Sequence, residues 1–282
     1  MSKRKPPRNV IVVSDIHAGC KLGLCHDEGV PLDDGGYYKP SRLQKQVYQW
    51  WLEFWNDWVP MVTHGEPWDF VFNGDAIDGV HHGSTTQISH NVQDQVDLAC
   101  KLLDPWVAAC RQSGGEYYHI RGTEAHVGKS GNLEEQLAKR LDAKANSEGQ
   151  RARWELWKKV GTDGLAHFLH HIGTTASAAH ESSAVNAELS SLYNEAGRWR
   201  NTPPDVVCRS HRHRCIEVRL PNRRGFATSV VTPAWQLKTP FTWKIAGARI
   251  SMPQIGGILI RQGDNDIYTR CKVWDIERSK PE

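Results

Sequence analysis

Asp15 and His17 are the first residues in the chain whose types and spacing suggest chemistry. They follow an apolar run at residues 10–13. A short, wholly apolar run predicts a strand buried on both faces of a sheet, and ligands in open α/β sheets gather just beyond the carboxyl ends of such strands. Residues two apart in an extended segment face the same side, so this carboxylate and this imidazole could bind one metal ion.

Four later apolar segments end in the same way. They lie at residues 69–72, 116–120, 165–169 and 205–209. The acidic and histidine side chains that follow them are Asp75, Asp78, Glu124, His126, His170, His171, His211 and His213. Carboxylates and imidazoles in such numbers can bind two divalent metal ions close together. The sequence therefore predicts a mixed histidine and carboxylate site where five strand ends meet.

The order of these motifs resembles that of the calcineurin-like metallophosphoesterase superfamily. The superfamily pattern is Asp-x-His, Gly-Asp-x-x-Asp, Gly-Asn-His-Asp/Glu, a strand-end His and Gly-His-x-His. Over residues 9–235 the chain matches the first, second, fourth and fifth motifs, with Ser210 in place of Gly in the fifth. The third motif departs from the pattern. Residues 122–126 read Gly-Thr-Glu-Ala-His, which lacks the Asn and has two extra residues before the His.

The resemblance implies a centre of two metal ions with Asp75 as the ligand that bridges them. It divides five further ligands between the two ions: Asp15, His17 and His213 bind one, and His170 and His211 bind the other. In similar enzymes of the purple acid phosphatase type, the ligand is the first residue after the apolar run. This favours His170 over His171, which would then lie behind the ligands or face the substrate.

The irregular third motif leaves one ligand position open. In the superfamily, the Asn binds metal and the His protonates the leaving oxygen or stabilises the transition state. His126 takes the catalytic role of that His, and Thr123 falls at the position of the Asn. A neutral hydroxyl is a weaker ligand than an amide oxygen, and Glu124 is an alternative carboxylate donor. The departure affects the second metal rather than the first.

Two further polar residues beside the motifs invite interpretation. Asp78 is interpreted as a residue that orients a ligand histidine, with a turn cap before Gly79 as the alternative. Arg121 flanks the third motif, and a guanidinium group suits bidentate binding of phosphate. An ordinary surface position is an equal alternative for Arg121, as it is for Arg209, Arg212 and Arg214 near the last motif.

Composition narrows the function classes. The 282 residues include 35 Lys and Arg against 32 Asp and Glu, for a formal net charge of +3. This balance provides no overall attraction to nucleic acid or anionic membrane, although it permits a local basic patch. Residues 1–8 form a basic arm, followed by an apolar run too short for a secretion signal. We expect a single domain over residues 9–282, because this length suffices for a sizeable core.

The cysteines predict the cellular compartment. There are seven, an odd number without paired spacing, which favours reduced thiols and a cytoplasmic location. Cys20 and Cys25 beside His26 would make half of a zinc site, but the sequence has no second pair. No segment reaches the length of a membrane span.

Apolar spacing predicts the helices and strands that position the site. Ser41 would cap a helix that ends before Pro60 and buries Leu43, Val47, Trp50, Trp51, Phe54 and Trp58. A second helical pattern begins near Asp94, and Pro105 would kink or break that helix. A third begins at residues 132–135, which resemble a capping box, and a fourth spans residues 183–199. Strand patterns follow at 215–220, 226–232, 254–261 and 267–274. This α/β order agrees with the resemblance, which implies two packed mixed β-sheets flanked by helices in a four-layer αββα sandwich.

The predicted function is that of a metal-dependent phosphoesterase, which hydrolyses phosphomonoesters or phosphodiesters with a bridging hydroxide. The expected cofactors are two divalent ions, with Mn preferred and Fe, Zn, Co or Ni compatible with the same ligands. The expected partner is a phosphoester substrate, a class that includes nucleotides and nucleic acids. A DNA nuclease of the same superfamily and a non-catalytic scaffold are the alternatives.

Overall fold

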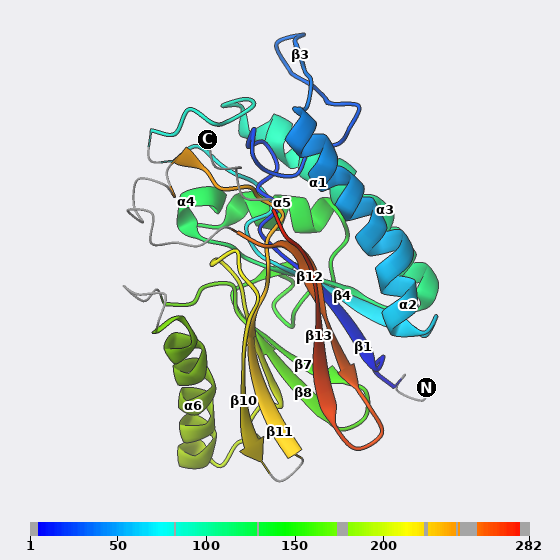
Figure 1. Cartoon of the computed structure of the whole chain (residues 1–282), viewed down its shortest axis with the longest axis vertical. Coiled ribbons are helices and arrows are strands. Elements are labelled where there is room, and N and C mark those ends of the chain that lie inside the picture. Colours follow the sequence, from blue (N-terminus) through cyan, green and yellow to red (C-terminus); the bar gives the residue numbers. More distant parts are fainter. Residues whose placement is uncertain are drawn as a thin grey trace, which may run out of the picture.

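Two mixed β-sheets packed face to face form the centre of the computed structural model (Figure 1). The structure describes residues 5–276 except 82, 129, 174–179, 223–224, 241 and 243–252. The helices and strands in chain order are β1 (Asn9–Val13), β2 (Val30–Pro31), β3 (Tyr37–Tyr38), α1 (Arg42–Glu53), the π-helix η1 (Phe54–Trp58), α2 (Val59–Thr63), β4 (Trp68–Asn73), α3 (Val92–Ser113), β5 (Tyr117–Ile120), α4 (Glu124–Val127), α5 (Asn132–Arg140), β6 (Ala152–Arg153), β7 (Leu156–Val160), β8 (Gly164–Phe168), α6 (Glu181–Trp199), β9 (Val206–Arg209), β10 (Ile216–Asn222), β11 (Gly225–Val231), β12 (Ile255–Gln262) and β13 (Ile267–Trp274).

Each sheet has a parallel centre. The first sheet has the order β13-β12-β1-β4-β5-β6, in which β1, β4, β5 and β6 run parallel and β12 pairs antiparallel with both β1 and β13. The second has the order β10-β11-β9-β8-β7, in which β8, β9 and β11 run parallel. The carboxyl ends of β1, β4, β5, β8 and β9 therefore carry the five predicted motifs.

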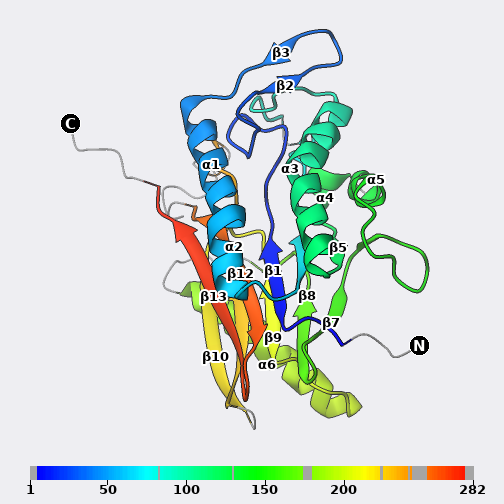
Figure 2. The same cartoon turned by 90° about the vertical axis from the view of Figure 1, so that its right-hand side faces the viewer.

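The alternation of side chains along β1 explains why its apolar run is continuous. Val10 and Val12 pack into the layer between the two sheets, while Ile11 and Val13 pack against the outer helices. Helices α1, α2, α3 and α5 cover the outer face of the first sheet, and α6 covers the second (Figures 1 and 2). The predicted fold class, two packed mixed sheets flanked by helices, is confirmed.

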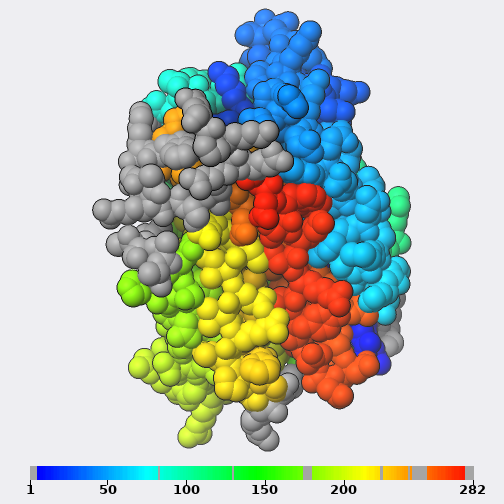
Figure 3. Space-filling model, viewed as in Figure 1, coloured from blue at the N-terminus to red at the C-terminus, as the bar shows by residue number. Residues whose placement is uncertain are grey.

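The two sheets also meet along one side of the molecule. Strands β10 and β13 run side by side there, and the Thr269 hydroxyl donates a hydrogen bond to the Glu217 carboxylate across the junction (Figure 3). The rest of the inter-sheet layer is mainly apolar, with Phe168, Val230 and Ile258 among its fully buried members. It also holds a buried ion pair between the sheets, in which Lys158 Nζ of β7 lies 2.6 Å from Asp69 Oδ2 of β4. The docking of the sheets thus rests mainly on hydrophobic contact.

The aromatic segment after Ser41 is core, as predicted. Trp51, Trp55 and Trp58 are buried, and the Trp51 ring packs edge-on against Trp235 with centroids 4.8 Å apart. Ser41 caps α1 through a capping box with Gln44. Two details of the prediction were wrong: Leu43 is 59% exposed, and the helical path does not end before Pro60. Pro60 lies in the first turn of α2, where the helix does not use a backbone N–H.

Two other helix predictions need correction. Helix α3 runs through Pro105 to Ser113, so Pro105 does not break it, while a kink there stays a prediction. The capping box expected at residues 132–135 is absent, because α5 begins after Gly131, which has a left-handed backbone and no side-chain cap. Within the described residues, no helix is both long and apolar enough to cross a membrane.

Candidate metal centre

The five motifs come together in the loops that leave the strand ends. Backbone hydrogen bonds join these loops directly: Asp15 N donates to the Gly74 carbonyl at 2.9 Å, and His17 N donates to the Asp75 carbonyl at 3.2 Å. In the second sheet, Ser210 N donates to the His170 carbonyl at 2.9 Å. The site therefore lies across the junction of the two sheets, as the strand order requires.

The first group of candidate ligands contains Asp15, His17 and His213. Asp15 Oδ1 lies 3.2 Å from His213 Nε2 and 4.0 Å from His17 Nε2. The two Nε2 atoms are 3.3 Å apart. One atom from each residue can thus reach a common point, and the three side chains could hold one metal ion.

The second group contains Asp75, His170 and His211. Asp75 Oδ2 lies 3.0 Å from His170 Nε2 and 4.0 Å from His211 Nδ1. Asp75 also forms a potential ligand group with His17 and His126. Its carboxylate therefore lies within reach of both metal positions, which is the geometry a bridging ligand needs.

The residues present fit divalent metal ions. Asp15 Oδ1 and His170 Nε2 are buried, lie only 4.0 Å apart and make no well-aligned hydrogen bond among the described residues, although His213 Nε2 and Asp75 Oδ2 lie within ion-pair distance of them. Buried polar atoms are normally satisfied, so such atoms facing one another call for a further partner. Mixed imidazole and carboxylate groups suit Mn, Fe, Zn, Co and Ni.

Backbone conformation marks the same residues independently of the motifs. Eight non-glycine residues of the described chain have positive φ, and three of them, His64, Asp142 and Arg200, lie at helix C-termini, where a left-handed residue is common. The other five are the candidate ligands Asp15, His17, Asp75, His211 and His213. A left-handed residue other than glycine costs on the order of 1–2 kcal/mol. Backbone strain concentrated in this way is typical of functional sites.

The buried charges influence one another strongly. Burial alone would raise the pKa of the Asp15 carboxyl, but His213 and His170 hold it at about 2. The pKa of Asp75 is likewise held well below its usual value, against the effect of burial, chiefly by His170 and His126. Burial would lower the pKa of His170, but Asp75 and Asp15 raise it to about 10. The imidazole of His170 between these two carboxylates is therefore protonated at neutral pH.

The irregular third motif places Thr123 directly on the bridging carboxylate. Thr123 N and Oγ1 donate to Asp75 Oδ1 at 2.8 and 3.1 Å. Glu124 is exposed at the start of α4 and belongs to no ligand group of the described residues. The hydroxyl of Thr123, rather than the carboxylate of Glu124, thus lies beside the metal positions.

His126 is oriented by the backbone of the second motif. Its Nδ1 donates to the Asp78 carbonyl at 2.7 Å, which leaves Nε2 free to act on another group. Its ring lies edge-on to that of His17, with centroids 4.5 Å apart. Burial is the main cause that lowers the pKa of His126 to about 4.

Asp78 lies behind the ligands. Its Oδ1 is 3.4 Å from His17 Nδ1, and its Oδ2 accepts a hydrogen bond from Gln87 Nε2 at 2.9 Å. A carboxylate in this position fixes the ring of a ligand histidine and the nitrogen that faces the metal. His81 is 3.7 Å from the same carboxylate and forms a further potential ligand group with Asp78 and His126.

The arginines and His171, which flank the motifs, contact other groups of the protein. Arg121 donates to the carbonyls of Ala152 and Ser130, at 3.0 and 2.9 Å, and lies over the Trp154 ring. The other three arginines contact neighbouring side chains or carbonyls: Arg209 pairs with Glu188, Arg212 donates to the Glu181 carbonyl, and Arg214 pairs with the Glu181 carboxylate. His171 is exposed, and its ring centroid lies 4.9 Å from that of His211.

Sequence reasoning missed the polar network beneath the site. Ser210 accepts from Asn73 Nδ2 and from the Thr232 hydroxyl, both at 2.7 Å, and Thr232 is 2.7 Å from the Ser14 hydroxyl. All four residues are fully buried and lie at or directly after the ends of strands from both sheets: β1 and β4 of the first, β9 and β11 of the second. The one available signal was the Ser in place of Gly in the fifth motif, since a hydroxyl at that position can join the two sheets.

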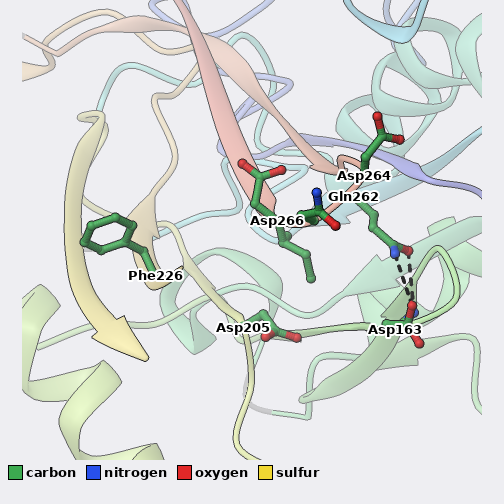
Figure 4. Close-up of a pocket in the computed structure, with 8 residues that line it drawn as sticks. Asp163, Asp205, Phe226, Gln262, Asp264 and Asp266 are labelled. Atoms are coloured by element: carbon green, nitrogen blue, oxygen red, sulfur yellow. Dashed lines mark hydrogen bonds between the residues drawn. The ribbon is translucent and has the colours of Figure 1, made fainter. Parts of the chain in front are cut away.

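A separate pocket lies at the opposite end of the strands. It is lined by residues that begin strands β8, β9 and β11 and by the turn between β12 and β13, including Asp163, Asp205, Phe226 and Gln262 (Figure 4). Gln262 Nε2 donates toward Asp163 Oδ2 at 3.5 Å. None of the residues that line it is a candidate ligand, so this pocket is not part of the metal centre.

No protein-family model matches the chain, and no curated protein matches it. Among solved structures, Vps29 from Entamoeba histolytica in complex with Zn²⁺ is 10% identical with a TM-score of 0.41, and the match covers 95% of this chain and 98% of that one. Vps29 from Cryptosporidium parvum is 8% identical with a TM-score of 0.35, over 97% and 100% of the two chains. The Thermus thermophilus sulfate thiohydrolase SoxB in complex with glycerol is 9% identical with a TM-score of 0.41, over 97% of this chain and 57% of that one. At such identities and TM-scores these likenesses support no functional argument, which therefore depends on the ligand groups of the chain itself.

Proposed function

We propose that the chain is a phosphoesterase that depends on two divalent metal ions. The observation that carries the proposal is the pair of ligand groups joined through Asp75: one contains Asp15, His17 and His213, and the other contains His170 and His211. The left-handed backbone at five of these residues supports a functional rather than a structural role. The motif resemblance to calcineurin-like metallophosphoesterases supplies the class of reaction.

The chemistry divides between the ions and the side chains around them. Two divalent ions in these groups would neutralise the phosphate oxygens and lower the pKa of a water molecule so that hydroxide forms near neutral pH. Asp75 would hold both ions at a fixed separation, and Thr123 would fix the orientation of the Asp75 carboxylate through the hydrogen bonds to Oδ1. Asp78 would keep the ring of His17 in place.

His126 is the proposed general acid. Because Nδ1 donates to the Asp78 carbonyl, Nε2 carries a proton only in the imidazolium form of the ring. The negative charge of a bound phosphoester would therefore have to raise the pKa of His126 from about 4 before Nε2 could protonate a leaving oxygen. His17 and Asp75 also lie within ligand distance of His126, so a ligand role in place of the missing Asn is the competing assignment. The two roles differ in what is lost when the imidazole is removed: a ligand role predicts lower metal content, and an acid role predicts only a lower rate of hydrolysis.

The proposal is tested by a panel of substrates with purified, metal-stripped protein. We expect Mn²⁺ to restore hydrolysis of an aryl phosphomonoester or a bis-aryl phosphodiester, and a chelator to abolish it. Asp75→Asn serves as the inactive control, because it retains the shape of the site but not the bridging charge. Plasmid nicking under the same conditions would identify a nuclease.

The outcomes separate the alternatives. Protein that binds two equivalents of metal yet hydrolyses none of the three substrates would refute the proposed function and favour a scaffold that keeps the fold and the ligands. Protein that hydrolyses them equally well after exhaustive chelation would refute the metal dependence. Activity restored by Mn²⁺ and lost in Asp75→Asn would support both.

A further inference from the structure

Glu134 is a fully buried carboxylate that does not face the metal positions. It projects from α5, and its Oε1 accepts a hydrogen bond from Ala76 N at 2.9 Å. Its Oε2 accepts a second hydrogen bond from Gly122 N at 2.5 Å. His119 Nε2 lies 3.8 Å from Oε1, and the Glu134 charge also acts on the buried Tyr117 hydroxyl. Buried carboxylates are rare, and this one is satisfied mainly by two backbone amides.

The two amides belong to the loops that build the bridging ligand. Ala76 directly follows Asp75, and Gly122 directly precedes Thr123, which donates two hydrogen bonds to Asp75. The loops touch so closely that a Cβ on Gly122 would lie 2.0 Å from Asp75 Oδ1. One side chain thus holds together the second motif and the irregular third motif.

We propose that Glu134 is a positioning residue of the metal centre, acting as a clasp that sets the distance between the Asp75 and Thr123 loops. Its effect on metal binding rests on the proposed two-metal function, whereas the clasp itself rests only on the two hydrogen bonds. The third motif has two residues more than the superfamily pattern, so its loop needs an anchor that the pattern does not supply. Helix α5 provides that anchor from outside the motif.

A carboxylate is suited to this task because it offers two acceptors and no donor. Glutamine has nearly the same shape, but its amide has one acceptor oxygen and an NH₂ group. In Glu134→Gln the NH₂ group would face one of the two backbone N–H groups, and that amide would lose its partner. A buried donor without a partner is unfavourable, so one loop would move away from the helix.

The neighbouring residue is a matched control on the same helix. Glu135 also accepts backbone hydrogen bonds, from Arg151 N at 3.1 Å and Ala152 N at 2.7 Å. These amides lie at strand β6, outside the ligand loops. Glu134→Gln and Glu135→Gln therefore make the same chemical change one residue apart. The first removes an acceptor from the amides of Ala76 and Gly122, whereas the second weakens a 3.5 Å ion pair with the Arg121 side chain and leaves those two amides untouched.

Amide hydrogen exchange in the metal-free protein and metal titration by calorimetry test the proposal together. In Glu134→Gln we expect the amides of Ala76 and Gly122 to exchange at least ~10-fold faster, and metal affinity to fall by roughly 10–100-fold, as for other residues that support metal ligands. In Glu135→Gln we expect faster exchange at Arg151 and Ala152, with metal affinity within about twofold of wild type. Glu134→Asp keeps both oxygens and provides a second variant if the glutamine variant fails to fold. With a shorter side chain, it should give an intermediate loss of affinity.

Each result bears on one of the two proposals. Unchanged exchange at Ala76 and Gly122, or wild-type metal affinity in a folded Glu134 variant, would overturn the role of Glu134 whatever the catalytic activity. A wild-type protein that binds two ions but hydrolyses no phosphoester would overturn the proposed function. The metal affinity of Glu134→Gln would still test the positioning role of Glu134. A wild type that binds no metal would also overturn the proposed function, and amide exchange alone would then test the clasp.

Discussion

Metal binding should expel a proton from His170. The Nδ1 atom of this residue donates to the Asn73 carbonyl at 2.6 Å, so the second proton of the imidazolium lies on Nε2, 3.0 Å from Asp75 Oδ2. Asp75 and Asp15 outweigh the effect of burial and raise the pKa of His170 to about 10. A metal ion needs the lone pair of the same Nε2 atom, so the proton and the metal compete for one position.

The size of this competition follows from the pKa. At pH 7 the pKa of about 10 leaves only ~1 in 10³ of the metal-free molecules with a neutral His170. The measured affinity should therefore be about 10³-fold, or about 4 kcal/mol, below that of the deprotonated site. The sign is fixed: affinity rises with pH, by about tenfold per unit from neutrality, and the rise ends as pH approaches 10.

Calorimetric titration of Mn²⁺ into metal-stripped protein would measure this effect. At pH 7, titrations in two buffers of different ionisation enthalpy should show release of about one proton attributable to His170. His170→Asn should bind more weakly and release one proton fewer than wild type. His171→Asn, which changes the adjacent exposed imidazole, should resemble wild type in both respects.

Two results would contradict this reasoning. If wild type and His170→Asn release the same number of protons, the Nε2 proton of His170 does not compete with the metal. If His171→Asn rather than His170→Asn loses the proton release, the ligand is the other histidine of the pair. Either result would require a different second metal position.

Four further predictions concern the other candidate ligands and His126. Asp75→Asn should abolish turnover and lower metal content measured by elemental analysis, because it removes the shared anionic ligand, and normal turnover of a metal-loaded variant would contradict the bridge. His211→Ala and His213→Ala should each lose the binding of a different ion in a metal titration. If both variants bind two ions as tightly as wild type, this pair of histidines has a structural role. His126→Ala should keep both ions and lose rate by ~10²–10⁴-fold for alkyl phosphates but far less for nitrophenyl phosphates, which need no proton to leave. Equal rate losses for both kinds of substrate, together with a reduced metal content, would show that His126 is a metal ligand. In metal-free protein, the pKa shift of Asp15 from 3.8 to about 2 corresponds to about 2 kcal/mol of stability, fully present above pH 3.8 and lost as pH falls through about 2. Acid unfolding of Asp15→Asn should lack this dependence, and an identical profile would contradict it.

The strand ends were predictable from sequence because an apolar run followed by Asp or His is a local signal. Runs before Asp15, Asp75 and His211 are real strands, and parallel strands necessarily bring their carboxyl ends to one edge. What this reasoning could not supply is the spacing across the junction. The 3.3 Å approach of His17 to His213 depends on how two sheets dock, and no local pattern encodes that distance.

The glutamates of α5 show how a local pattern can mislead. Residues 132–135 have the letters of a capping box, in which the glutamate is Glu135, and the pattern assigns that side chain to the helix's own backbone. In the structure, Glu135 instead accepts from the Arg151 and Ala152 amides at strand β6, and the neighbouring Glu134 accepts from the Ala76 and Gly122 amides of two distant loops. Tertiary contacts determine both sets of partners, since all four amides lie outside α5. Pro60 is a similar case, because the preceding π-helix permits the helical path to continue where a simple rule ends it.

The position of the ligands across the sheet junction has a consequence for how the molecule is held together. Asp15, His17 and Asp75 follow strands of the first sheet, whereas His170, His211 and His213 follow strands of the second. Each ion would therefore take ligands from both sheets and act as a reversible cross-link between two halves that are otherwise joined mainly by apolar contact. Free ion at 100 times its dissociation constant would add about 2.7 kcal/mol to that junction. Conversely, a species in which the sheets have formed but not yet docked would have no complete site, so the uptake of metal during folding would report the moment at which the two halves close.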